Sequence, residues 1–209
     1  MKFNLYCIES KEYPFKQSTI KKTWKLFSKQ EEDVSLFNST KINDGQYHVV
    51  FQLSDEHVSK TKKGGVELTV PFSQYVNAFL IGGIFFLENN NSNYTGLIID
   101  FIEKEYDLKP IPFNINNQSI LSLLNATKAY IKKLELTNEE EEEDFEYSGI
   151  PFEELKELVD AKTITFVNFL YGNVFISVNK LNGALSINTK DEEELLKILG
   201  ETTSAISVN

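Results

Sequence analysis

The sequence contains no arginine, so all of its positive side-chain charge comes from lysine. Acidic residues outnumber the lysines by 31 to 21, which gives a formal net charge of -10. Arginine is the side chain that most often binds phosphate and guanine in a bidentate manner. Its absence, together with the acidic balance, argues against a protein that binds nucleic acid or an anionic membrane.

Cysteine is represented only by Cys7, and histidine only by His48 and His57. A single cysteine excludes an internal disulfide and a thiolate metal cluster. The N-terminal residues form no apolar signal-peptide core, and the longest apolar run, 76–87, is much shorter than the roughly 20 residues that cross a bilayer. We therefore expect a protein of a reducing compartment, the cytoplasm, that has no contact with a membrane.

Sequence motifs that are characteristic of catalytic or cofactor-binding sites are also missing. The sequence has no glycine-rich dinucleotide motif, no P-loop and no G-x-S-x-G nucleophile motif. We expect no cofactor and no metal ion, and the sequence identifies no catalytic residue. These absences favour a non-catalytic protein but leave the enzyme question open.

The clearest structural pattern lies between residues 161 and 187. Its three runs of β-branched and aromatic residues occupy 163–171, 174–178 and 184–187. Such residues suit a pleated, half-buried surface, and the Gly172-Asn173 pair between the first two runs tolerates the positive φ of a tight turn. The pattern predicts a three-stranded antiparallel meander. Alternation predicts that one buried face carries Ile164, Phe166 and Leu170 from the first strand and Val174, Ile176 and Val178 from the second.

A second set of strands is predicted near the N-terminus. Residues 2–8 alternate, and so do 46–53 and 66–72, which we interpret as a hairpin. The segment 54–65 that connects the two hairpin strands is expected to be a long loop, and long loops often carry function.

Helices are predicted where apolar residues recur at helical spacing. The expected ranges are 18–28, 97–106, 118–136 and 151–159. A last helix starts at the capping box of Thr189 and ends just before Gly200, and a frayed tail follows. Residues 73–80 fit either a short helix or the first strand of a hairpin that turns at Gly82-Gly83, and periodicity does not decide between them.

Together these elements predict an α+β fold, with an N-terminal hairpin and a C-terminal three-stranded meander packed against amphipathic helices. We expect one domain over residues 1–209, with an acidic flexible loop at 137–148. The alternative is two subdomains, 1–136 and 149–209, joined by that loop.

The loop contains the one strongly biased segment, in which seven of eight residues are acidic. These residues are Glu139, Glu140, Glu141, Glu142, Glu143, Asp144 and Glu146. Like charges at this density repel and extend the chain. The segment is either a solvated spacer or the surface that binds a basic partner protein.

Two histidines with neighbouring carboxylates are the remaining candidates for chemistry. His48 lies on the less apolar face of a predicted strand, and His57 lies beside Asp55 and Glu56 in the predicted loop. Such a set can share a proton or bind a metal, but the spacing matches no metal motif. Solvated histidines on a strand and a loop are the more common explanation.

Three functional hypotheses remain. The first is a non-catalytic intracellular protein-binding module, such as an accessory, inhibitor or immunity-type protein, whose acidic surface meets a protein partner that is basic. The second is a divergent hydrolase or nuclease whose carboxylates and histidines meet only in the fold. The third is a regulatory subunit of a defence or mobile-element system. The sequence does not determine the oligomeric state.

Overall fold

The computed structural model describes residues 1–9, 13–15, 33–60, 67–89, 91–138, 140, 142–159 and 162–206. These residues form eleven strands and four helices, and every strand pairing that they show is antiparallel, so the fold is mixed α+β with a predominance of sheet. The helix predicted over 18–28 lies outside the described residues. None of the described helices is both long and apolar enough to cross a bilayer.

The chain divides into two compact units. Unit 1 comprises Met1–Cys7 and Ile111–Asn209, and unit 2 comprises Ile8–Pro110. The division therefore falls after Cys7 and after Pro110.

The strands of unit 1 follow the order β1-β11-β10-β9-β7-β8, with the short β6 pairing with β1. Their bounds are β1 (Lys2–Cys7), β6 (Ile111–Pro112), β7 (Tyr130–Asn138), β8 (Glu143–Ile150), β9 (Thr163–Tyr171), β10 (Val174–Asn179) and β11 (Ala184–Ile187). β9, β10 and β11 form the predicted meander, and Gly172 has the positive φ of 58° that its turn requires.

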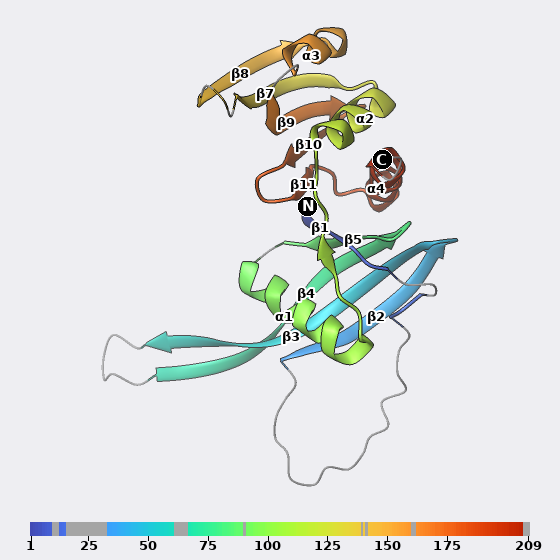
Figure 1. Cartoon of the computed structure of the whole chain (residues 1–209). Helices are drawn as coiled ribbons and strands as arrows, with labels where there is room; N and C mark the ends of the chain where they lie inside the picture. The colour runs from blue at the N-terminus through green and yellow to red at the C-terminus, as the bar shows by residue number, and fades with distance from the viewer. Residues whose placement is uncertain are drawn as a thin grey trace. The chain divides into compact units, whose positions relative to one another are not determined.

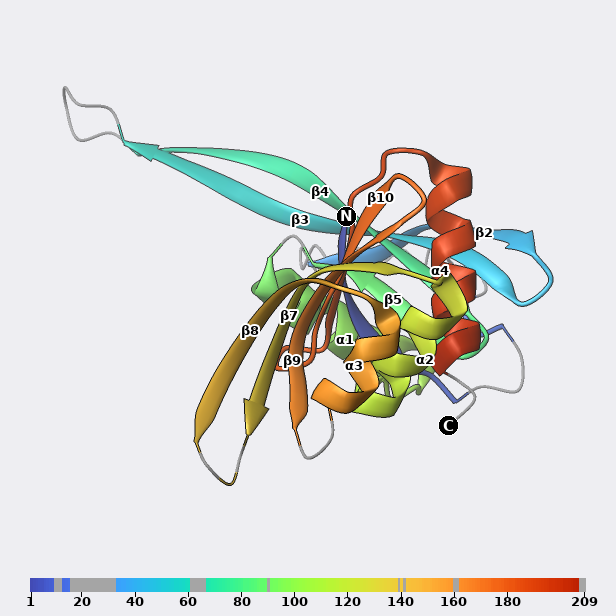
Figure 2. The same cartoon turned by 90° about the horizontal axis from the view of Figure 1, so that it is seen from above.

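Three helices belong to unit 1 and lie on the same side of its strands (Figure 2). They are α2 (Asn117–Thr127), α3 (Phe152–Leu158) and α4 (Glu192–Ile206). The sheet face with the most buried side chains supplies Phe3 and Leu5 of β1, Leu134 of β7, Val174, Ile176 and Val178 of β10, and Leu185 of β11. The buried side chains of α2 and α4 complete this core.

Two helix predictions in unit 1 are wrong in extent. The helix predicted over 118–136 ends at Thr127, because Lys128 is left-handed with φ 45° and Tyr130 begins β7. α4 continues past Gly200 to Ile206, since Thr202, Thr203 and Ala205 extend its buried face. Its first turn is capped by Asp191, whose Oδ1 accepts a hydrogen bond of 2.8 Å from the backbone of Glu194.

A bulge in β9 changes the face that we predicted for its second half. Glu135 of β7 pairs with Phe166, whereas the next residue, Leu136, pairs with Ile164, so Thr165 is the extra residue. A bulge reverses the alternation beyond it. Ile164 is buried as predicted, but Val167 and Phe169 follow it into the core, and Phe166 and Leu170 are only half-buried.

The described residues of unit 2 form a four-stranded sheet in the order β2-β3-β4-β5 and one helix. Its elements are β2 (Val34–Asn43), β3 (Gln46–Lys60), β4 (Glu67–Ile81), β5 (Ile84–Glu88) and α1 (Ser92–Tyr106). Residues 73–80 are strand, so the helix alternative is wrong and the hairpin through Gly82-Gly83 is confirmed. Both glycines have positive φ, 56° and 86°, as a type I′ turn requires.

The core of unit 2 lies between α1 and one face of this sheet. Buried aromatic rings dominate it: Phe15 lies 6.1 Å from Phe51 and 5.6 Å from Phe85, measured between ring centroids. Phe101 of α1 lies 6.1 Å from Phe51, which places the helix over this face. Val76 and Ala78 of β4 are buried on the same face.

Candidate functional site: the β3–β4 arm

β3 and β4 pair along fifteen residues each, from Gln46 opposite Ile81 to Lys60 opposite Glu67. Within the described part of the chain, β2 reaches β3 only as far as Leu53, and β5 reaches β4 only from Ala78 onward. Residues 54–60 and 67–73 therefore form a two-stranded ribbon, here called the β3–β4 arm. The arm continues beyond α1 in both views (Figures 1 and 2). At about 3.3 Å per residue it is roughly 20 Å long.

The arm occupies part of the segment that we predicted to be a loop. Alternation in 66–72 identified one strand correctly, but 54–60 is also strand. Polar residues dominate 54–60, and a strand that is exposed on both faces has no hydrophobic pattern to reveal it. The arm was therefore missed as a structural element.

One face of the arm carries an exposed apolar row. Leu68, Val70 and Phe72 are 57%, 45% and 41% exposed, respectively, and they alternate along β4, so they point to the same side. The half-buried Gln74 comes next on this face, and Val76 and Ala78 then continue the alternation without a bulge and are 1% and 0% exposed. The apolar row is therefore the core face of unit 2 extended past its covered part.

The root of the arm is attached to α1 through Asp55. The phenol of Tyr94, in the first turn of α1, donates a hydrogen bond to Asp55 Oδ2, and the backbone N–H of Glu56 donates to Oδ1 at 2.7 Å. These bonds, the phenol first, lower the pKa of Asp55, and the bond to Asp55 raises the pKa of Tyr94. Across the strands, Gln52 Nε2 donates to Ser73 Oγ at 2.9 Å.

A polar groove lies beside this root. Its lining residues are Asp33, Ser54, Asp55, Glu56, Pro71, Phe72 and Ser73. Among the described residues, the lining includes three carboxylates and the exposed ring of Phe72 but no basic side chain. Carboxylates beside an aromatic ring suit a lysine or arginine side chain, which both groups attract.

The structure separates the two histidines that we considered as one site. His57 is exposed in the arm, opposite Val70, and His48 precedes it by nine residues on the same strand, or roughly 30 Å at the usual rise. Asp55 and His57 share one face of β3, whereas Glu56 lies on the other. No group of three or more His, Cys, Asp or Glu side chains in the described ranges could hold a metal ion.

His48 belongs to a chain of hydrogen bonds across three strands of unit 2. Its Nε2 lies 3.0 Å from Asn77 Oδ1, and Asn77 Nδ2 donates to Glu88 Oε2 at 2.8 Å. Because a carboxylate only accepts, the amide NH₂ of Asn77 faces Glu88 and its oxygen faces His48, so the network assigns a proton to His48 Nε2. The imidazole also stacks on Phe79 with the ring centroids 4.8 Å apart. Sequence reasoning missed Asn77 and Glu88, because only the strand register brings them beside His48.

The acidic segment 139–146 lies in the hairpin between β7 and β8. Glu143, Asp144 and Glu146 are in β8, and β7 ends at Asn138, so 137–138 and 143–148 of the range that we expected to be a loop are strand. Thr137 Oγ1 donates to Asp144 at 2.8 Å, and Lys133 Nζ lies 3.2 Å from Glu146. Glu139 and Glu141 lie outside the described residues. The acids of β8 are thus partly paired within their own sheet.

Comparisons with known proteins add no family. No protein-family model matches the sequence, and the search of curated proteins found no similar protein.

Proposed function

We propose that this chain is a non-catalytic protein-binding module that holds its partner with the β3–β4 arm. The observation that carries the proposal is the apolar row Leu68, Val70 and Phe72, which extends the core face of unit 2 beyond its cover. An isolated two-stranded ribbon is at best marginally stable in water. A partner that covers this face would bury the three side chains, as α1 buries the rest of the same face.

The charges beside the arm indicate which charge the partner carries. The groove at the root carries Asp33, Asp55 and Glu56 next to the ring of Phe72, and the whole chain has a net charge of -10. Such a surface attracts a positively charged partner and speeds its approach. The proposed partner segment is therefore apolar where it meets the row and carries a lysine or arginine side chain for the groove.

The acidic segment 139–146 has a secondary part in this proposal. Its residues add to the negative field that attracts a basic protein, but Asp144 and Glu146 already have hydrogen-bond or ionic partners within unit 1. We assign the direct contact to the arm, because its three exposed apolar side chains continue the core face of unit 2.

The experiment is a comparison of two variants in capture from the native host. The arm variant replaces Leu68, Val70 and Phe72 with serine, and the control replaces Leu181 and Phe175 of unit 1, which are 81% and 43% exposed, with serine. We expect the wild type and the control to capture the same partner after cross-linking and the arm variant to lose it. Far-ultraviolet circular dichroism should show all three chains folded.

Capture of the same partner by the arm variant would contradict the proposal. Sedimentation velocity of the purified chain over a range of concentrations identifies whether the partner is a second copy. In that case, we expect the wild type to self-associate and the arm variant to remain monomeric.

A further inference from the structure

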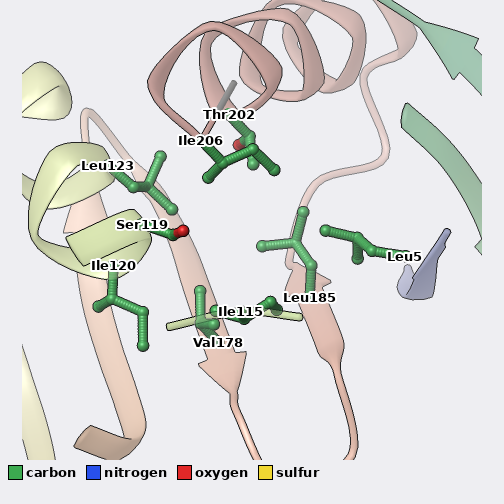
Figure 3. A pocket seen from close by; sticks show the side chains of 9 residues that line it. All are labelled: Leu5, Ile115, Ser119, Ile120, Leu123, Val178, Leu185, Thr202 and Ile206. Atoms are coloured by element: carbon green, nitrogen blue, oxygen red, sulfur yellow. The ribbon is translucent and has the colours of Figure 1, made fainter. Parts of the chain in front are cut away.

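A small cavity lies inside unit 1, between α2, α4 and the sheet (Figure 3). Seven of its nine lining residues are apolar, and the two others are Ser119 of α2 and Thr202 of α4. About 10 Å³ is open to the centre of a water-sized sphere, which is close to the minimum room for one water molecule.

The two polar side chains are almost completely buried. Thr202 is 2% exposed, and Ser119 is 1% exposed. The hydroxyl of Thr202 has no hydrogen-bond partner among the described protein atoms. A buried hydroxyl that loses its hydrogen bonds to water without replacing them destabilises the folded state. The side chain therefore needs an explanation.

Neighbouring hydroxyl residues of α4 donate hydrogen bonds to backbone carbonyls of their own helix. Thr203 Oγ1 donates to the carbonyl of Leu199 at 2.9 Å, and Ser204 Oγ donates to the carbonyl of Gly200 at 3.0 Å. Both bonds return to the preceding turn of the same helix. Thr202 instead presents its hydroxyl to the cavity, where it faces the wall formed by α2.

Ser119 has acceptor capacity left for a bridge. Its hydroxyl donates a hydrogen bond to Asn116 Oδ1 at 3.1 Å. Asn116 Oδ1 also accepts a hydrogen bond of 2.8 Å from the backbone N–H of Ser119 and so caps α2. The proton of the Ser119 hydroxyl is therefore used, whereas its lone pairs still accept. A molecule that accepts from Thr202 and donates to Ser119 matches both groups.

We propose that this cavity is a binding site for one structural water molecule that bridges Thr202 of α4 and Ser119 of α2. The water accepts the Thr202 proton and donates one of its own to Ser119 Oγ. It satisfies the buried hydroxyl and joins two helices that lie on the same side of the sheet. The surrounding apolar side chains keep the bridge out of contact with bulk solvent.

A double-mutant cycle of Thr202→Val and Ser119→Ala tests the bridge by thermal unfolding. Each single change should lower the Tm by about 2–4 °C, the shift expected for one lost hydrogen bond in a chain of this size. The double variant should fall well short of the sum, because either change removes the same water. Thr203→Val is the matched control, and its effect should add to that of Ser119→Ala.

Any of three results would overturn the bridge. A Tm that is unchanged or higher in Thr202→Val would show a hydroxyl without a partner. If the Tm decrease of Thr202→Val added fully to that of Ser119→Ala, as expected for the Thr203→Val control, the Thr202 hydroxyl would be bonded to its own helix. A crystal structure should show solvent density about 2.7–3.0 Å from both hydroxyl oxygens, and density absent there would also contradict the proposal.

Discussion

The phenol of Tyr94 in α1 donates a hydrogen bond to the carboxylate of Asp55 in β3. Asp55 pairs with Phe72, the first exposed member of the apolar row counted from the core. This bond therefore joins α1, which covers the core of unit 2, to the root of the β3–β4 arm. Beyond this attachment, the described residues of β3 and β4 pair only with each other.

Tyr94→Phe should loosen the arm without unfolding the chain. The change removes the hydroxyl and keeps the ring, so the apolar contacts of α1 remain. Amide hydrogens of 55–60 and 67–72 should exchange faster, whereas those of Val49, Phe51 and Val76 should keep their protection. Hydrogen exchange with mass spectrometry measures both regions in one experiment. Tyr75→Phe, an exposed tyrosine of β4, is the control and should leave the arm unchanged.

The same bond predicts how the stability of the chain depends on pH. The pKa of Asp55 is lowered in the folded state, so its contribution is complete above the ordinary value of 3.8 and is lost as the pH falls through the lower folded value. The pKa of Tyr94 is raised, so its contribution is complete below 10.0 and is lost as the pH rises through the higher folded value. The stability difference between the wild type and Tyr94→Phe should be largest between about pH 4 and 10. Urea unfolding at pH 3, 7 and 11 measures it, and a difference that grew at either extreme would contradict the assignment.

In β9, the bulge at Thr165 predicts which phenylalanine belongs to the core. Phe169 is 0% exposed, whereas Phe166 is half-buried under Lys133, whose Nζ lies 5.9 Å from the ring centroid. Phe169→Ala should cost about 3–5 kcal/mol, the range for a large buried aromatic side chain, and Phe166→Ala should cost clearly less. Chemical denaturation of both variants gives the comparison, and equal losses would place both rings in the core.

The sequence reveals elements whose alternation is unbroken and whose turns carry glycine. β10 and β11 belong to this class, whereas the Gly82-Gly83 hairpin was one of two alternatives that periodicity did not separate. Alternation fails at Thr165, because one inserted residue reverses every face that follows. Helical spacing failed over 128–136, where Lys128 ends α2 and the apolar residues then serve a strand.

The candidate site was harder to predict for a different reason. Leu68, Val70 and Phe72 have the pattern of a half-buried strand, and the sequence predicted that strand correctly. Their exposure depends on where β5, β2 and α1 end, which is a property of the whole sheet. The relation of His48 to Asn77 and Glu88 depends in the same way on a register set by two separate hairpins.

Asn77→Asp should destabilise unit 2 at neutral pH. The new carboxylate would face Glu88 Oε2, which now accepts the Asn77 amide at 2.8 Å. Two carboxylates at this distance cannot both ionise without a large penalty, so they would share a proton. We expect a loss of about 1–3 kcal/mol at pH 7 that becomes smaller near pH 4. Asn77→Gln is the matched neutral control. A loss that is independent of pH would mean that the two groups separate instead of interacting.

Two valines of β4 provide the sharpest test of the arm, because they have the same chemistry on the same face of one strand. Val76 is 1% exposed and Val70 is 45% exposed. Val76→Glu buries an unpaired carboxylate and should cost at least about 3–4 kcal/mol or prevent folding. Val70→Glu places the same charge on an exposed ribbon and should change the stability by roughly 0.5 kcal/mol or less. Urea unfolding measures both variants.

The binding result then separates an exposed strand from a binding surface. If the apolar row meets a partner, Val70→Glu should abolish capture although the chain stays folded, because the partner would have to bury the new carboxylate. Thr69→Glu, one residue away on the opposite face of the arm, is the control and should capture the partner nearly as well as the wild type does. A folded Val70→Glu variant that still captured the partner would show that the row is a solvated extension of the core face, with the contact made elsewhere.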